Sequence, residues 1–148
     1  MPDFDPIAAR RVVATPDALD ALGADPSTTC LRLAPDEVLI ISDSTASDSA
    51  TVDAVLTGDR HAIAVEDAGW CAARCEEAVV RDFLSWATTW RLPKRGAADT
   101  GEVVGTDRPL LLQGMAAGVP VKVWLSGEGH ALVLVPTPMA HDLQERWT

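Results

Sequence analysis

The stretch TTCLRLAPDEVLIIS, residues 28–42, places the strongest constraint on the fold. Two runs rich in strand-forming residues flank Ala34-Pro35-Asp36-Glu37, where Pro-Asp favours a tight turn. The second run, Val38 to Ile41, is continuously apolar, which is typical of a strand buried on both faces. The stretch therefore predicts a β-hairpin whose second strand lies inside a sheet.

Helices and further strands surround this hairpin in an irregular order. A short helix is expected at 16–22, with Thr15 as its N-cap, Pro16 at its first position and Gly23 ending it. The remaining elements are expected as helices at 50–56, at 76–89 and after the cap Thr137, and as strands at 61–66, 108–114, 119–125 and 130–136. A further strand before the helix at 76–89 is left open.

This order of elements indicates the fold class. Mixed connectivity of helices and strands favours an α+β fold with mainly antiparallel sheets and helices packed on one face. The 148 residues suit a single domain, 1–148. Residues 1–15 form a lead-in without a structural prediction. Residues 93–107 contain Gly and Pro with few apolar side chains, so we expect a loop or an insertion there.

Charge and hydropathy exclude several classes of partner. Twelve basic residues stand against 22 acidic ones, which gives a formal charge of −10. Such a field repels phosphate backbones and anionic lipids, so neither nucleic acid nor a membrane surface is expected as a partner. No apolar run approaches the roughly 18 residues of a membrane span. The first residues lack the apolar region of a secretory signal, so a cytoplasmic location is expected.

Cys71 and Cys75 in GWCAARCEE are the first candidates for chemistry. In a strand their Cα atoms would lie about 13 Å apart, too far for a disulfide, whereas in a helix the distance would be about 6 Å. No second Cys pair or His pair completes a zinc site, and Cys30 stands apart in the sequence. We therefore expect structural thiols and no metal site. A small thiol enzyme that uses Cys71 or Cys75 is the alternative.

The histidines and acidic doublets indicate no catalytic centre, and no catalytic residue is predicted. His61, His130 and His141 are dispersed, and no candidate nucleophile adjoins them. Adjacent residues of a strand point to opposite faces, so acidic doublets rarely form an acid–base dyad. We assign the doublets to a turn, a strand end and a helix N-terminus: Asp36-Glu37, Glu66-Asp67 and Glu76-Glu77. The glycines match no nucleotide-binding loop, and no cofactor is expected.

The segment near the C-terminal strands carries three unusual residues. Gly118 is expected to adopt a positive φ at a hairpin corner, and Pro120 indicates an edge strand or the first residue of a strand. Gln113 is flanked by apolar residues, so its amide is expected either to satisfy buried backbone groups or to reach a ligand. Together with Glu66 and Asp67, Gln113 forms the set of candidate polar groups for a small-molecule pocket.

Longer stretches of the chain resemble a known family. The stretches that carry the resemblance are PDALDALGAD with LRLAPDEVLIIS, then HAIAVEDAGWCAARCEEAVVRDFLSWATTWRL, then QGMAAGVPVKVWLSGEGHALVLVPTPMAHDLQERW. In this order, over residues 16–147, they are similar to the gamma subunit of heterotetrameric sarcosine oxidase. Two stretches depart from the family pattern: Glu66-Asp67-Ala68-Gly69, and residues 94–107, which resemble an insertion.

The resemblance implies a fold like that of the folate-binding domain of glycine-cleavage aminomethyltransferases. It also implies an accessory subunit without a cofactor of its own, because the flavins and NAD of the oxidase belong to its larger subunits. Docking onto those larger protein subunits is the expected role. Two alternatives stay open: a stand-alone module that binds a folate-like small molecule, and a regulatory protein that self-associates as a homodimer through an exposed sheet edge.

Overall fold

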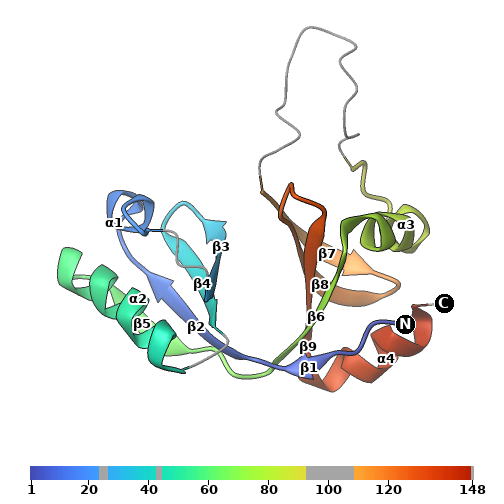
Figure 1. Cartoon of the computed structure of the whole chain (residues 1–148), viewed down its shortest axis with the longest axis horizontal. Helices are drawn as coiled ribbons and strands as arrows, with labels where there is room; N and C mark the ends of the chain where they lie inside the picture. Colours follow the sequence, from blue (N-terminus) through green and yellow to red (C-terminus); the bar gives the residue numbers. More distant parts are fainter. Residues whose placement is uncertain (24–26, 43–44, 93–108, 148) are drawn as a thin grey trace, which may run out of the picture. The chain divides into compact units, whose positions relative to one another are not determined.

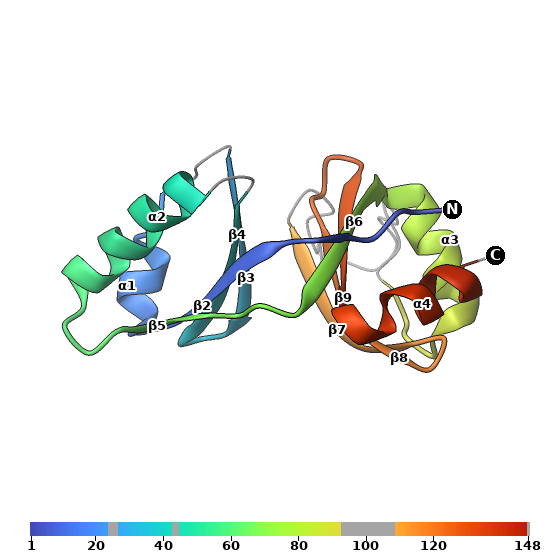
Figure 2. The same cartoon turned by 90° about the horizontal axis from the view of Figure 1, so that it is seen from below.

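The computed structural model describes residues 1–23, 27–42, 45–92 and 109–147. The chain divides into two compact units, one formed by Pro6–Trp70 and the other by Met1–Asp5 with Cys71–Thr148. Each unit contains one sheet, and α-helices cover one face of it (Figures 1 and 2). The predicted α+β class is confirmed. The predicted loop at 93–107 lies outside the described residues, and the single-domain prediction for 1–148 stays a prediction.

The unit Pro6–Trp70 has a four-stranded antiparallel sheet in the order β3-β4-β2-β5. The strands are β2 (Ala8–Val13), β3 (Thr28–Ala34), β4 (Glu37–Ser42) and β5 (Ile63–Glu66), and the helices are α1 (Pro16–Asp20) and α2 (Thr45–Gly58). The two helices lie on one face of the sheet, where they bury an aliphatic core. This core comprises Val12, Ala14, Leu19, Val38, Ile40, Val52 and Val55.

The predicted hairpin at 28–42 is confirmed as β3 and β4. Val38 to Ile41 are all buried in β4, and β4 has neighbours on both sides, as the apolar run indicated. Its second neighbour is β2, which lies in the lead-in 1–15, where no element was predicted. The pair Arg10-Arg11 interrupts the apolar pattern of β2. Arg11 is compatible with this sheet because Glu37 and Asp67 both pair with its guanidinium.

The second unit has a five-stranded sheet in the order β1-β6-β9-β8-β7. Its strands are β1 (Asp5–Pro6), β6 (Trp70–Glu76), β7 (Leu110–Ala116), β8 (Val119–Leu125) and β9 (His130–Pro136). Its helical elements are α3 (Glu77–Ala87), the single 3₁₀ turn Thr137–Met139 and α4 (Ala140–Arg146). The strand that the sequence left open before α3 is therefore β6.

The helices α3 and α4 bury their apolar sides against this sheet. The ring of Phe83 on α3 stacks on that of Trp147 with centroids 3.8 Å apart, and Leu143 on α4 is fully buried beside them. In β8 alternate side chains point into this core: Val119, Val121, Val123 and Leu125. Trp147, just after α4, is also buried, whereas Met139 is exposed.

Of the two predicted helix caps, Thr15 is confirmed as the N-cap residue of α1 and Thr137 is wrong. The side chain of Thr15 makes no capping hydrogen bond, and its backbone N–H donates to a carboxylate oxygen of Asp59. Thr137 begins a 3₁₀ turn without a side-chain cap, and α4 begins only at Ala140. The hydroxyl of Thr137 instead lies 3.6 Å from the sulfur of Cys71. At Thr137 a tertiary partner thus takes the place of local capping.

The turn between β7 and β8 contains only Ala117 and Gly118. Both have positive φ, 49° and 80°, which is the type I′ geometry that suits a two-residue hairpin. The predicted positive φ of Gly118 is confirmed. Pro120 is the second residue of an internal strand, so the edge or first-residue prediction is wrong. Proline is tolerated there because β9 pairs with β8 only from Lys122 to Leu125.

The lengths and hydropathies of the helices were compared with those of membrane spans. Among the helices in the described part of the chain, none is both long and apolar enough to cross a bilayer.

Candidate functional site

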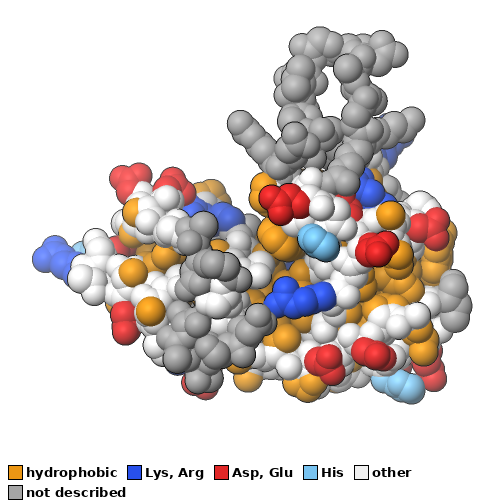
Figure 3. All heavy atoms as spheres, viewed as in Figure 1, with side chains coloured by type: hydrophobic (Ala, Val, Ile, Leu, Met, Phe, Trp, Pro, Cys, Tyr) orange, Lys and Arg blue, Asp and Glu red, His pale blue; other side chains and the backbone are white. Residues whose placement is uncertain are grey.

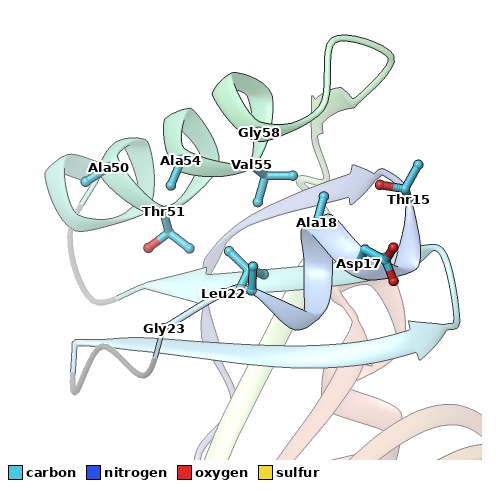
Figure 4. A pocket seen from close by; sticks show the side chains of 11 residues that line it. Thr15, Asp17, Ala18, Leu22, Gly23, Ala50, Thr51, Ala54, Val55 and Gly58 are labelled. Atoms are coloured by element: carbon cyan, nitrogen blue, oxygen red, sulfur yellow. The ribbon is translucent and has the colours of Figure 1, made fainter.

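A groove lies between α1 and α2 in the unit Pro6–Trp70 (Figure 4). Its volume is about 580 Å³. On α2 it is lined by Ala50, Ala54 and Gly58, which recur at every fourth position and therefore lie on one side of the helix. On α1 it is lined by Ala18 and by residues beyond the helix, up to Gly23. Because these side chains are small, the two helices leave space between them.

Polar groups occur at the groove in three places. Thr15 and Asp17 lie at the start of α1, and Thr51 lies on α2 (Figure 4). Among the described lining residues there is no Cys, His, Lys or Arg. One carboxylate and two hydroxyls, without a histidine, a cysteine or a cation beside them, suit contact with a partner or ligand better than acid–base chemistry.

Asp59 lies at the end of α2 and is nearly buried. Its carboxylate accepts hydrogen bonds from the backbone N–H of Thr15 at 2.8 Å and from that of His61 at 2.9 Å. The bond from Thr15, followed by that from His61, holds the pKa of the Asp59 carboxyl below its ordinary value. Asp59 thus fixes the start of α1 to the end of α2, and its role is structural.

The three polar residues predicted for a pocket each have a different environment. Glu66 is exposed at the end of β5, and Asp67 accepts a hydrogen bond from Arg11 Nη2 at 2.9 Å. Gln113 belongs to the other compact unit, where its exposed amide oxygen accepts a hydrogen bond from Lys122 Nζ at 2.8 Å. None of the three is among the described lining residues of the groove. A ligand-binding role for them stays a prediction.

The cysteines are not joined by disulfides. Cys71 and Cys75 lie in strand β6, the geometry for which the sequence excluded a disulfide between them. Cys71 is buried, and partial burial raises the pKa of the Cys75 thiol. A reactive cysteine requires a lowered pKa, so the environment of Cys75 is that of a structural thiol. Cys30 is exposed in β3.

The histidines lie at exposed positions. Arg60 Nε donates a hydrogen bond to His61 Nε2 at 3.1 Å, and His141 lies 3.2 Å from the carboxylate of Glu145 on α4. His130 begins β9. No group of three or more His, Cys, Asp or Glu side chains with the arrangement of a metal site occurs in the described ranges.

Several hydrophobic side chains reach the surface. On the face drawn in Figure 3 they occur in several places, with Asp and Glu side chains scattered among them. Trp86 on α3 is 53% exposed, and Val79, two turns earlier on the same side of the helix, is 48% exposed. Asp82 lies between them on α3. We call Val79, Asp82 and Trp86 the α3 surface.

Packing inside the unit holds Trp86 in place. Its ring meets that of Phe83 edge to face, with centroids 5.1 Å apart, and Phe83 stacks in turn on Trp147. A large aromatic side chain that is half exposed yet supported from beneath is typical of an interface anchor.

The architecture defines the chain as an α+β protein with two sheets, each covered on one face by helices. A scan against protein-family models and a search of curated proteins give no match. Among solved structures, it is similar to a chain of the heterotetrameric sarcosine oxidase from Corynebacterium sp. U-96 in complex with pyrrole 2-carboxylate. The TM-score is 0.67 at 17% identity, over 99% of this chain and 80% of that chain. At this identity the likeness establishes a shared fold.

Sequence reasoning missed both the groove and the α3 surface. The repeat of Ala50, Ala54 and Gly58 was the available signal for the groove, but small residues at this spacing also occur in tightly packed helix pairs. The signal for the α3 surface was the placement of Val79 and Trp86 on the predicted helix 76–89. Apolar residues on a helix predict burial by default, and only the packing shows that Val79 and Trp86 point outward.

Proposed function

We propose that this chain is a non-catalytic accessory subunit of the cytosol that docks onto larger flavoprotein subunits of an amine-oxidising complex. The observation that carries the proposal is the fold match along 99% of the chain with a chain of a heterotetrameric sarcosine oxidase. The resemblance of residues 16–147 to the gamma subunit family points to the same kind of complex.

The environments of the acidic side chains support an assembly role. Asp59 binds backbone N–H groups, Asp67 pairs with Arg11, and the buried Glu77 pairs with Arg81 at 2.7 Å. Backbone N–H groups and arginine side chains of the same chain bind these carboxylates, as is usual for carboxylates that stabilise a fold.

The α3 surface is the docking site that we propose for the larger subunit. Trp86 supplies apolar area at a low entropic cost because Phe83 already restricts its ring. Asp82 supplies a charge at the same place, which contributes to orientation more than to affinity.

Co-expression tests the proposal. The tagged chain is produced together with the flavoprotein subunits of an amine oxidase from the same organism, and the product is separated by size-exclusion chromatography. We expect flavin absorbance to co-elute with the chain at a fixed stoichiometry, while the chain alone elutes without flavin and oxidises no secondary amine. Elution of the chain apart from the flavoprotein subunits would contradict the proposal.

A second candidate function is the binding of a folate-like molecule. The groove between α1 and α2 favours it, because about 580 Å³ falls within the roughly 300–1,000 Å³ of small-molecule sites. Calorimetric titration with a reduced folate would show heat that the groove-filling variant Ala54→Leu abolishes. The variants Glu66→Gln, Asp67→Asn and Gln113→Ala test the residues expected from the sequence. Absence of heat with the wild-type chain would exclude this candidate.

A further inference from the structure

Asp82 is a carboxylate placed between two apolar side chains on the α3 surface. It follows Val79 by three residues and precedes Trp86 by four, so the three side chains lie along one side of the helix. All three are exposed. The hydroxyl of Ser85 donates to the backbone carbonyl of Asp82 at 2.7 Å, but within the described ranges the carboxylate itself has no hydrogen-bond or ion-pair partner.

Arg81 is the one basic residue of α3, and its charge is used on another side of the helix. Arg81 Nε donates to the carboxylate of Glu77 at 2.7 Å, and Glu77 is buried. Adjacent residues of an α-helix lie about 100° apart around its axis, so this pair lies to one side of Asp82. The charge of Asp82 is therefore not neutralised from within α3.

This arrangement limits what can cover the α3 surface. A partner that packs on Val79 and Trp86 also removes water from the carboxylate between them. A carboxylate that loses its water without gaining a partner is strongly unfavourable, so a purely apolar surface would not dock here. The partner must therefore bring a group that binds Asp82.

The ring of Trp86 favours a cation for this role. Its plane is nearly perpendicular to that of Phe83, at 86°, so Phe83 covers at most one face of the indole. Trp86 is 53% exposed, which leaves a face of the ring open to a partner. The face of an indole attracts Lys and Arg, and a guanidinium can stack on it while its N–H groups bind a carboxylate. Cβ atoms four residues apart on a helix are separated by about 6 Å, so one guanidinium can reach both Asp82 and Trp86.

We propose that the larger subunit places an arginine side chain on the α3 surface, where the guanidinium pairs with the Asp82 carboxylate and stacks on the Trp86 indole. This inference rests on the proposed function, because it names the chemistry that the docking subunit presents. The excess of acidic over basic side chains in this chain, 22 against 12, favours a basic partner surface at longer range as well.

Binding kinetics of the complex test the proposal. The chain is immobilised, the flavoprotein subunits are bound to it, and both rate constants are measured. An ion pair adds little net affinity, but removing one of its charges leaves the other buried and unpaired. We therefore expect Asp82→Asn to raise the dissociation rate about tenfold or more, with little change in the association rate. The control Asp53→Asn removes the same charge from an exposed position on α2 and should leave the dissociation rate unchanged.

A double-variant cycle tests whether one cation contacts both residues. Trp86→Leu keeps an apolar side chain but removes the aromatic face, so it should also raise the dissociation rate. If a single guanidinium bridges the two residues, the combined variant should dissociate more slowly than the product of the two single effects predicts. Circular dichroism of each variant checks that the fold is retained. Independent effects of the two substitutions, or an Asp82→Asn variant that changes only the association rate, would overturn the proposal.

The same measurements separate this proposal from the proposed function. A wild-type chain that does not bind the flavoprotein subunits would contradict both. A stable wild-type complex from which Asp82→Asn dissociates at the wild-type rate would contradict the arginine contact alone, and the accessory role would stand.

Discussion

At the scale of single residues, the turn Ala117-Gly118 shows how tertiary contacts hold an unfavourable conformation. An alanine with φ of 49° lies in the left-handed region, which destabilises a non-glycine residue by roughly 1–2 kcal/mol. Two hydrogen bonds fix it there. The N–H of Ala117 donates to the carbonyl of Ala87 at 2.8 Å, and Arg146 Nη1 donates to the carbonyl of Ala117 at 2.6 Å.

We expect Ala117→Asn to raise the free energy of unfolding by about 1 kcal/mol, because Asn-Gly is the preferred pair of a type I′ turn. Gly118→Ala should lower it by roughly 1–2 kcal/mol, since its φ is also positive and a Cβ there would lie 3.1 Å from Arg146 Nη1. Urea unfolding of the two variants measures both values. Effects of the same sign would contradict the geometry of the turn.

A second prediction at the residue scale concerns Asp59, which makes the stability of the fold depend on pH. Its carboxyl has a lowered pKa in the folded chain, so its contribution to stability is present above the ordinary value of 3.8 and is lost as the pH falls through the folded pKa. Asp59→Asn should therefore unfold at lower urea concentration than the wild type at neutral pH, and the difference should shrink below about pH 3.8. A difference that does not change with pH would show that ionisation of Asp59 is unimportant.

At the scale of elements, the segment after α3 is positioned by a glycine in β7. A Cβ built on Gly114 would lie 2.6 Å from a ring carbon of Trp90, so the indole rests directly on the backbone of β7. Trp90 packs at the margin of the core that α3 and the sheet bury. The absence of a side chain at 114 thus allows this segment to approach the sheet.

We expect Gly114→Ala to destabilise the fold by about 1–3 kcal/mol, because the indole must move out of a packed position. Trp90→Ala removes the obstacle, so the double variant should lose less stability than the sum of the two single variants. A double-mutant cycle in urea measures this coupling. Additive losses would mean that the ring and the strand are not in contact in solution.

At the scale of the whole molecule, the predictions concern cooperativity and docking. The chain passes between its two compact units twice, near residues 5–6 and 70–71. We keep the prediction of one domain, and we expect urea unfolding followed by tryptophan fluorescence and by circular dichroism to give one coincident transition. Two separated transitions would show that the units fold independently.

The α3 surface gives the prediction for assembly. In the co-expressed complex, Trp86→Ala should weaken the association with the flavoprotein subunits by about thirtyfold, as the loss of a central aromatic anchor does. Met115→Ala is the control, because Met115 on β7 is exposed to the same 53% and lies outside the α3 surface. Equal affinity of the Trp86→Ala variant and the wild type would show that α3 does not dock.

The sequence alone determined most elements of this protein, because each local pattern has a strong physical cause. The apolar run from Val38 to Ile41 required burial on both faces, and the β4 position supplies it. The helix predicted at 76–89 and the positive φ predicted for Gly118 correspond in the same way to α3 and to the β7–β8 hairpin. The spacing of Cys71 and Cys75 also excluded a disulfide between them once the segment is a strand.

Only the tertiary structure decided which groups meet across long sequence separations. Arg11 can lie in β2 because Glu37 and Asp67 pair with it, and no local pattern announces partners so far away along the chain. Thr137 is not the helix cap that the sequence predicted, and its hydroxyl lies beside the sulfur of the distant Cys71. The exposure of Trp86 and Val79 depends on what packs against α3, so the α3 surface became visible only in the fold.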